Sequence, residues 1–158
     1  MFKKVVLLAA VALPVLATSA FATDVDDTLD LSAEITGSCT NVVDAPINFG
    51  STIISLSSAV TASTTMTVNC TTGIPYTIGI TTGNNGGRFL ADGTGQFIDY
   101  ELYSDAGYSS IFQAVGTSVV GTTGNGADQS HTISARLPVQ TTPAVGVYTD
   151  QVLVTVRY

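Results

Sequence analysis

The chain is poor in the residues that make basic or metal-binding sites. It has no tryptophan, and lysine occurs only at Lys3 and Lys4, so the basic residues after position 22 are Arg88, Arg136 and Arg157. Against these three, the sequence has 12 Asp and Glu residues. Such an acidic balance argues against nucleic acid or anionic lipid as a partner.

Ligands for a metal are equally scarce. His131 is the only histidine, and Cys39 and Cys70 are the only cysteines. Two thiols without further ligands cannot build a zinc site. The aspartates near residues 24–30 lack the spacing of a calcium loop. We therefore expect no metal and no cofactor.

Long apolar runs are also missing after the first residues. Lys3 and Lys4 precede an apolar run at 5–16, and Ala20-Phe21-Ala22 forms an A-x-A cleavage site. The run is too short for a dependable membrane span. We interpret residues 1–22 as a signal peptide that directs export, with a retained N-terminal anchor as the alternative.

Export bears on the two cysteines. An oxidising compartment makes a disulfide between Cys39 and Cys70 the expected state. By the chain-entropy estimate, closing a loop of about 31 residues contributes roughly 3.7 kcal/mol to stability.

Helical periodicity is absent, whereas period-two alternation recurs. Apolar side chains alternate with polar ones at 66–70, 76–80, 98–102 and 133–137, and Gly, Asn and Asp clusters separate these runs. Many short strands with regular turns predict an all-β antiparallel sandwich.

The last residues predict a strand with an open edge. Val152, Val154, Val156 and Tyr158 alternate with more polar positions. We expect no later strand after Tyr158 to pair with this one. An unpaired apolar edge invites a strand from another chain.

Residues 28–35 carry the cleanest alternation in the sequence. Leu29, Leu31, Ala33 and Ile35 share one face, and polar side chains share the other. Two interpretations remain open. The segment is either the first strand of a closed sandwich, with a tight hairpin at residues 37–38, or it fills the groove of another copy. The second contact is head-to-tail and generates a fibre.

No constellation of residues predicts catalysis. Asp128, Ser130 and His131 lie in one short alternating stretch without a nucleophile elbow, so a polar strand start is the better interpretation. Tyr103 and Tyr108 could stack on sugars, although such residues more often pack across strands.

Several segments carry a family resemblance. They are residues 29–39, Ile47-Asn-Phe-Gly50, Thr67-Val-Asn-Cys70, Tyr76-Thr-Ile-Gly-Ile80, Arg88-Phe-Leu90, residues 98–105 and residues 146–156. In these segments the chain resembles the spore coat protein U domain family, which includes the major pilins of archaic chaperone–usher pili. The family's frequent Trp-Gly pair has no counterpart here.

The resemblance implies an incomplete immunoglobulin-like sandwich that lacks its last strand. It implies that a periplasmic chaperone lends a strand, which the next subunit's N-terminal segment replaces at an outer-membrane usher. Leu29, Leu31, Ala33 and Ile35 would then be donor side chains, Val152, Val154 and Val156 would line the acceptor groove, and Cys39 and Cys70 would match the family's disulfide.

We therefore expect a signal peptide at 1–22, a donor segment at 23–36 and a pilin-like domain at 37–158. The predicted function is a non-enzymatic subunit of a surface pilus that supports adhesion and biofilm formation. The expected partners are a chaperone, an usher and other copies or related subunits, with a homopolymer as the product and no nucleic acid. The alternatives are a spore or cell-surface coat protein and a monomeric carbohydrate-binding sandwich.

Overall fold

The computed structural model describes residues 23–51, 53, 55–113 and 120–158. The predicted signal peptide, residues 1–22, lies outside the described residues. The chain divides into an N-terminal stretch up to Glu34 and a folded unit, Ile35–Tyr158. The two are treated separately. Nowhere in the described ranges is there a helix that is long and apolar enough to cross a membrane.

Period-two alternation in the sequence becomes antiparallel strands in the structure. Within the described ranges the chain forms nine strands and no helix, and every strand pair is antiparallel. The strands are β1 (Cys39–Val43), β2 (Val60–Cys70), β3 (Pro75–Ile80), β4 (Phe89–Ala91), β5 (Phe97–Asp99), β6 (Glu101–Tyr103), β7 (Val120–Thr123), β8 (Asp128–Leu137) and β9 (Val154–Arg157).

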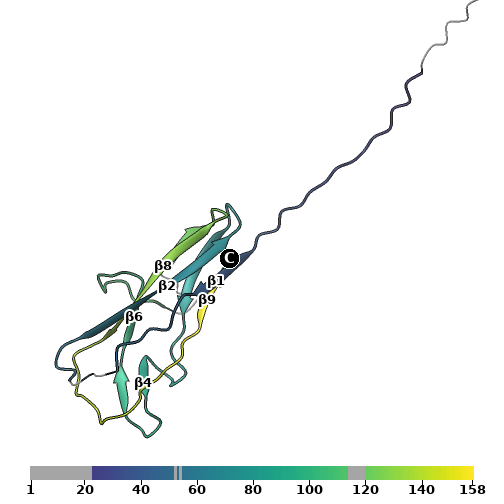
Figure 1. Cartoon of the computed structure of the whole chain (residues 1–158). Coiled ribbons are helices and arrows are strands. Elements are labelled where there is room, and N and C mark those ends of the chain that lie inside the picture. The colour runs from purple at the N-terminus through teal and green to yellow at the C-terminus, as the bar shows by residue number, and fades with distance from the viewer. Residues whose placement is uncertain (1–22, 52, 54, 114–119) are drawn as a thin grey trace, which may run out of the picture. The chain divides into compact units, whose positions relative to one another are not determined.

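Two sheets face each other across one core. One has the order β1-β2-β8-β6 and the other the order β7-β3-β9, with β4 and β5 forming a separate ribbon. Figure 1 shows β2 and β8, the two long paired strands, side by side. The predicted all-β antiparallel sandwich is confirmed. Strands β2, β3 and β8 bury side chains at alternate positions, and Leu56 and Phe112 from the connecting segments join them in the core. The strand residues are Met66, Val68, Cys70, Tyr76, Ile78, Ile80, Ile133, Ala135 and Leu137.

The alternating run at 98–102 does not form one strand. Ile98 belongs to β5, which pairs with β4, whereas Leu102 belongs to β6, which pairs with β8. Between them, the Tyr100 backbone N–H donates to the Arg88 carbonyl at 2.9 Å. The chain therefore changes its pairing partner at Tyr100 while its side chains continue to alternate.

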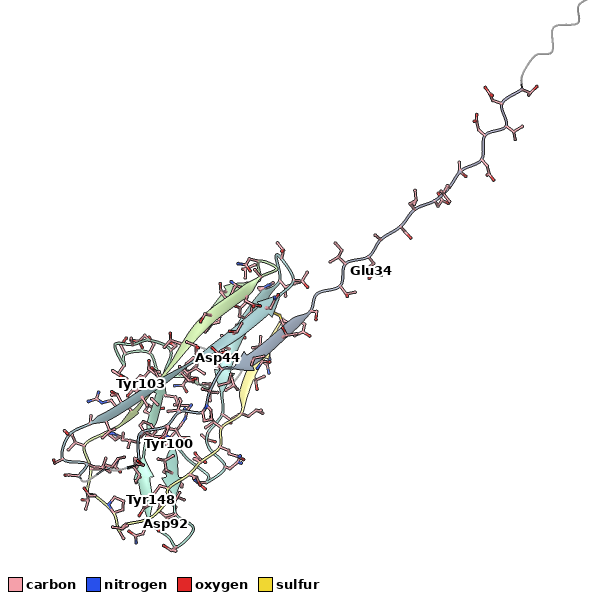
Figure 2. The ribbon with its side chains drawn as sticks, in the orientation of Figure 1. Glu34, Asp44, Asp92, Tyr100, Tyr103 and Tyr148 are labelled. Atoms are coloured by element: carbon pink, nitrogen blue, oxygen red, sulfur yellow. A yellow bond between two sulfur atoms is a disulfide. The ribbon has the colours of Figure 1, made fainter. Side chains whose placement is uncertain are left out.

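The β4–β5 ribbon is joined to the segment that leads into β9. Ala91 and Thr149 form an isolated antiparallel bridge, with both backbone hydrogen bonds at 3.0 Å. Tyr148 and Asp92 lie beside each other next to this bridge (Figure 2). The bridge fixes the start of the β9 segment at this end of the folded unit.

The expected disulfide is present between Cys39 and Cys70. The two residues are register partners at the ends of β1 and β2, with their Cα atoms 4.1 Å apart. β1 is otherwise an exposed edge strand, so it has little burial of its own to hold it. The bond therefore fastens the start of β1 to the fully buried end of β2.

Replacing both cysteines by alanine should lower the free energy of unfolding by roughly 3–4 kcal/mol, because the unfolded chain regains the entropy of a loop of about 31 residues. Denaturant unfolding of the variant and the oxidised parent measures this difference. A single Cys70→Ala change should cost about the same, because it removes the same bond and the same buried side chain. An unchanged midpoint for the double variant would contradict the prediction.

A polar contact crosses the core between the sheets. The Tyr76 hydroxyl on β3 lies 2.8 Å from His131 Nε2 on β8 and 3.3 Å from Gln129 Oε1. The rings meet edge to face with centroids 5.9 Å apart. Burial raises the pKa of Tyr76 and lowers the pKa of His131 from its ordinary value.

This contact predicts a loss of stability at acidic pH. Because the folded pKa of His131 lies below the unfolded value of about 6.5, the unfolded chain binds the proton first as pH falls. The contribution is present at neutral pH and is lost below about pH 6.5. Urea unfolding at about pH 7.5 and pH 5 should show a steeper decline for the parent than for His131→Gln. Equal declines would contradict this role.

Candidate functional site

Among the described residues, β9 is an edge strand, as the sequence predicts. It pairs with β3 on one side, and β3 pairs with β7 on its other side. The regular strand is shorter than the alternation at 151–158 suggests, because it begins at Val154. Val152 lies just before the strand. The neighbouring Leu153 N–H donates to the Thr81 hydroxyl at 3.0 Å and not to a backbone carbonyl.

Along this segment, the backbone N–H and C=O groups of successive residues point alternately to the two sides of the strand. The carbonyls of Leu153 and Gln151 accept from Thr81 N–H at 3.0 Å and Asn84 N–H at 2.9 Å, so odd-numbered residues direct their polar groups toward the β3 side. By period two, the N–H and C=O groups of Val152, Val154 and Val156 point to the open edge. These are the three residues that the resemblance assigns to an acceptor groove.

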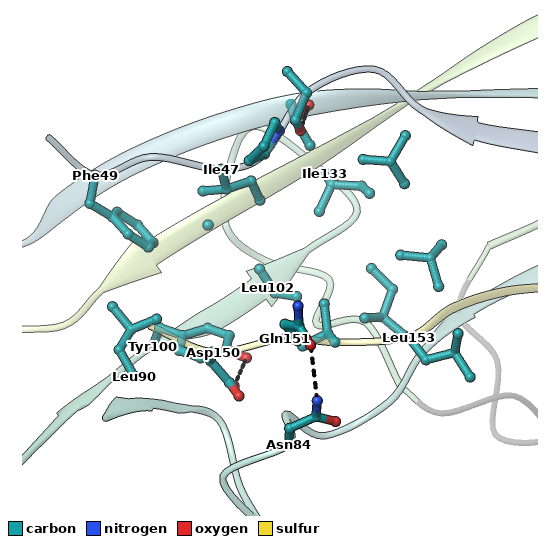
Figure 3. Close-up of a pocket in the computed structure, with 18 residues that line it drawn as sticks. Ile47, Phe49, Asn84, Leu90, Tyr100, Leu102, Ile133, Asp150, Gln151 and Leu153 are labelled. Atoms are coloured by element: carbon teal, nitrogen blue, oxygen red, sulfur yellow. Dashed lines mark hydrogen bonds between the residues drawn. The ribbon is translucent and has the colours of Figure 1, made fainter. Parts of the chain in front are cut away.

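An apolar groove of about 600 Å³ runs beside this edge. Its side chains come from three places: the segment after β1, the segment that leads into β9, and the core between them. In Figure 3, Ile47 and Phe49 lie on one side of the hollow, with Tyr100, Leu90 and Leu153 opposite. The lining includes Ala45, Pro46, Ile47, Phe49, Ile80, Leu90, Tyr100, Leu102, Ile133, Ala135, Val152 and Val154.

Sequence reasoning placed only one wall of this groove. Val152 and Val154 line it, whereas Val156 is not among the lining residues although it packs against the core. The opposite wall, Ile47 and Phe49, was missed as a site. Its signal was the motif Ile47-Asn-Phe-Gly50, in which two apolar side chains alternate.

One end of the groove is polar. Tyr100 donates its hydroxyl hydrogen to Asp150 Oδ2 at 2.6 Å, and Asn84 donates to Gln151 Oε1 at 3.3 Å (Figure 3). Burial, followed by the hydrogen bond to Asp150, raises the pKa of Tyr100. The Tyr100 phenol therefore stays protonated and remains a hydrogen-bond donor.

Residues 23–34 run as extended chain and have no strand partner within the described part of the protein. Leu29 is 82% exposed and Leu31 is 87% exposed, and Ala33 is also exposed. Ile35, the first residue of the folded unit, is 86% exposed. Four alternating apolar side chains are thus presented to solvent in one row, each without the burial that would stabilise it.

The tight hairpin considered at residues 37–38 is not formed. Gly37 is not among the glycines with positive φ in the described chain, as a two-residue hairpin turn would require. Ser38 instead continues the pairing of β1, because its carbonyl accepts from Thr71 N–H at 2.9 Å and its N–H donates to Thr71 Oγ1 at 3.1 Å.

Comparison of the sequence with protein families gives a match. The Spore Coat Protein U domain matches residues 25–155, which is most of the chain. The chain belongs to the Spore Coat Protein U domain family. No curated protein matches the sequence.

Solved structures resemble this member of the Spore Coat Protein U domain family in fold. One is a chain of the CsuC–CsuE chaperone–tip adhesion subunit pre-assembly complex from archaic chaperone-usher Csu pili of Acinetobacter baumannii. The TM-score is 0.58 at 19% identity, over 78% of this chain and 40% of that chain. The domain spans less than half of that neighbour, and the likeness supports an immunoglobulin-like sandwich.

The other candidate residues of this Spore Coat Protein U domain do not converge on a site. Asp128 accepts from Asn69 Nδ2 at 3.0 Å and His131 contacts Tyr76, so the predicted polar start of a strand is what β8 shows. Tyr103 and Tyr108 stack edge to face on each other, with centroids 5.4 Å apart. Among the described residues, no group of three or more His, Cys, Asp or Glu could hold a metal.

Proposed function

We propose that the chain is a structural subunit of a surface pilus whose copies join by donor-strand exchange. One observation carries the proposal. A single chain holds an apolar groove beside the open edge of β9 and, separately, an exposed row of apolar side chains at residues 29–35. Membership of the Spore Coat Protein U domain family supports it.

The mechanism is physical and involves no covalent chemistry. The N-terminal segment of one copy enters the groove of another and pairs its backbone with Val152, Val154 and Val156, whose N–H and C=O groups point outward. Burying each larger donor side chain contributes about 1.5–3 kcal/mol. Since every copy has one groove and one N-terminal segment, the contact repeats and forms a fibre.

Subunits with an open apolar groove aggregate if the groove is left uncovered, so assembly of this kind needs a protein that covers the groove beforehand. We assign this task to a periplasmic chaperone, and delivery of the subunit to an outer-membrane usher. The neighbour in the Csu pilus system is a chaperone–subunit complex, which supports such a partner. Residues 1–22 act as the export signal, and the assembled fibre serves adhesion and biofilm formation.

The test is the mass of the exported, purified full chain before and after strong denaturation without reductant. A series of multiples of one chain that collapses to a single species supports strand exchange. Deleting residues 23–36 should leave a protein that binds its chaperone and does not polymerise. A chain that stays monomeric, compact and resistant to heat without any partner would contradict the proposal.

A coat protein of a spore or cell surface is the second candidate, and the family description favours it. It uses the same domain and the same groove. Genes for a chaperone and an usher beside this one would indicate a pilus, and their absence together with localisation of the protein in a spore or cell coat would indicate the coat role.

A further inference from the structure

Arg157 stands apart among the cations of the folded unit. Arg88 is largely buried and lies 3.8 Å from Glu101, and Arg136 lies 5.8 Å from the ring centroid of Tyr108. Arg157, on edge strand β9, is exposed and has no ion-pair partner within the described part of its own chain. A positive charge is therefore exposed on β9 of a strongly acidic protein, where the side chain lines a separate hollow with Thr77 and Thr122 and not the groove.

The position of Arg157 in the strand favours contact with an added strand. Arg157 is the register partner of Thr77 on β3. Like the other odd-numbered residues of this segment, it directs its backbone N–H and C=O groups toward β3 and away from the open edge. Opposite an added antiparallel strand, it therefore occupies a non-hydrogen-bonded pair. Side chains approach most closely in such pairs.

We propose that Asp30 of a second copy pairs with Arg157 and thereby sets the register and direction of the incoming strand. This inference rests on the proposed function. If the incoming strand is antiparallel and Leu31 lies opposite Val156, then Asp30, on the other face of that strand, lies opposite Arg157. The four donor side chains Leu29, Leu31, Ala33 and Ile35 then lie opposite Tyr158, Val156, Val154 and Val152 in turn.

Other antiparallel registers are poorer. A shift by two residues in one direction puts Ile35 opposite Asp150, whose carboxylate is held by Tyr100, and it leaves Thr28 opposite Arg157. A shift by two in the other direction leaves Val152 uncovered in the groove. A shift by one residue turns the polar face of the segment inward.

Direction follows from the remaining charges. Asp92 and Asp150 adjoin the Ala91–Thr149 bridge, at the start of the β9 segment, and Arg157 lies at the opposite end. A parallel strand carries the leader aspartates at positions 24, 26 and 27 toward those two carboxylates. An antiparallel strand carries them past Arg157, so the electrostatics favour the antiparallel direction.

The test is a charge exchange in the full chain, followed by the rate at which multimers form at low salt. Arg157→Asp alone and Asp30→Arg alone should each slow assembly by roughly tenfold, because attraction becomes repulsion at a directly opposed pair. The combined variant should return to within about threefold of the parent. Combining Arg157→Asp with Glu34→Arg is the matched control and should remain slow.

Cysteine pairs give an independent measurement in the full chain. After mild oxidation, Asp30→Cys with Arg157→Cys should give a series of disulfide-linked multimers that survives denaturation and disappears on reduction. Glu34→Cys with Arg157→Cys should not. A series from the Glu34 pair alone would show a parallel strand and would overturn the inference.

Failure of this inference is distinguishable from failure of the proposed function. If neither charge reversal slows assembly while Leu31→Asp still abolishes it, strand exchange stands and the Asp30–Arg157 pair is wrong. If Leu31→Asp also assembles normally, the donor assignment itself is wrong, and the pairing is lost with it.

Discussion

The full chain carrying Leu31→Asp should bind the proposed chaperone and form no multimers. Leu31 is one of the two central members of the exposed row, and in the proposed register its burial against Val156, which packs on the core, contributes about 1.5–3 kcal/mol. Burying an unpaired carboxylate there costs several kcal/mol more. The sum weakens the contact between copies by roughly a thousandfold or more. Native mass measurement of the exported protein, with and without co-expressed chaperone, checks both parts.

Ser32→Asp is the matched control for this variant. It adds the same charge one residue away, on the face of the segment that stays toward solvent in the proposed complex. It should assemble nearly as well as the parent. If the two variants behave alike, the effect is one of charge in the segment and not of fit into the groove, and the assignment of Leu31 as a donor side chain is wrong.

Interior strands were predictable from the sequence because the residues on their two faces differ in polarity and so produce an alternating pattern. In β2 and β8, most inward positions are apolar and most outward positions are Thr, Ser or another polar residue, although Thr64 and Ser134 are also buried and His131 contacts Tyr76 across the core. The alternation fixes which residues face the core, and Met66, Val68, Ile133 and Leu137 are buried as expected. Buried strands of this kind need no knowledge of their neighbours to be recognised.

Edge strands and pairing partners were not predictable in the same way. β1 has four exposed residues out of five, so its sequence shows no alternation, and the disulfide at Cys39 and the ladder to β2 hold it in place. At Tyr100 the alternation continues across a change of sheet, because a side-chain pattern records which face is buried and not which strand lies alongside.

The groove shows the same limit. The wall formed by Val152 and Val154 follows from the alternation of one strand, whereas the wall formed by Ile47 and Phe49 depends on how the segment after β1 lies across the core. Asp44 fixes this segment, since its N–H donates to the Thr65 carbonyl at 3.0 Å, and Thr64 donates to the Ala45 carbonyl at 2.8 Å. Such contacts between distant residues leave no periodic signature.

Val152→Asp should disable the groove and leave the N-terminal segment intact. Val152 is half-buried, lines the groove and precedes β9, so the folded unit should tolerate the change better than a change within the strand. A carboxylate there meets the donor row, and assembly should stop. Thr155→Asp is the control, since Thr155 lies between the inward-facing Val154 and Val156 and does not line the groove.

Mixing the two disabled proteins gives the strongest form of this prediction. Leu31→Asp retains a working groove, and Val152→Asp retains a working N-terminal segment. Equal amounts of the two, co-expressed, should therefore form a species of two chains and stop there, because the dimer has one spoiled groove and one spoiled segment left. Native mass should show this dimer only in the mixture. Longer multimers in the mixture would mean that the contact does not join one groove to one segment.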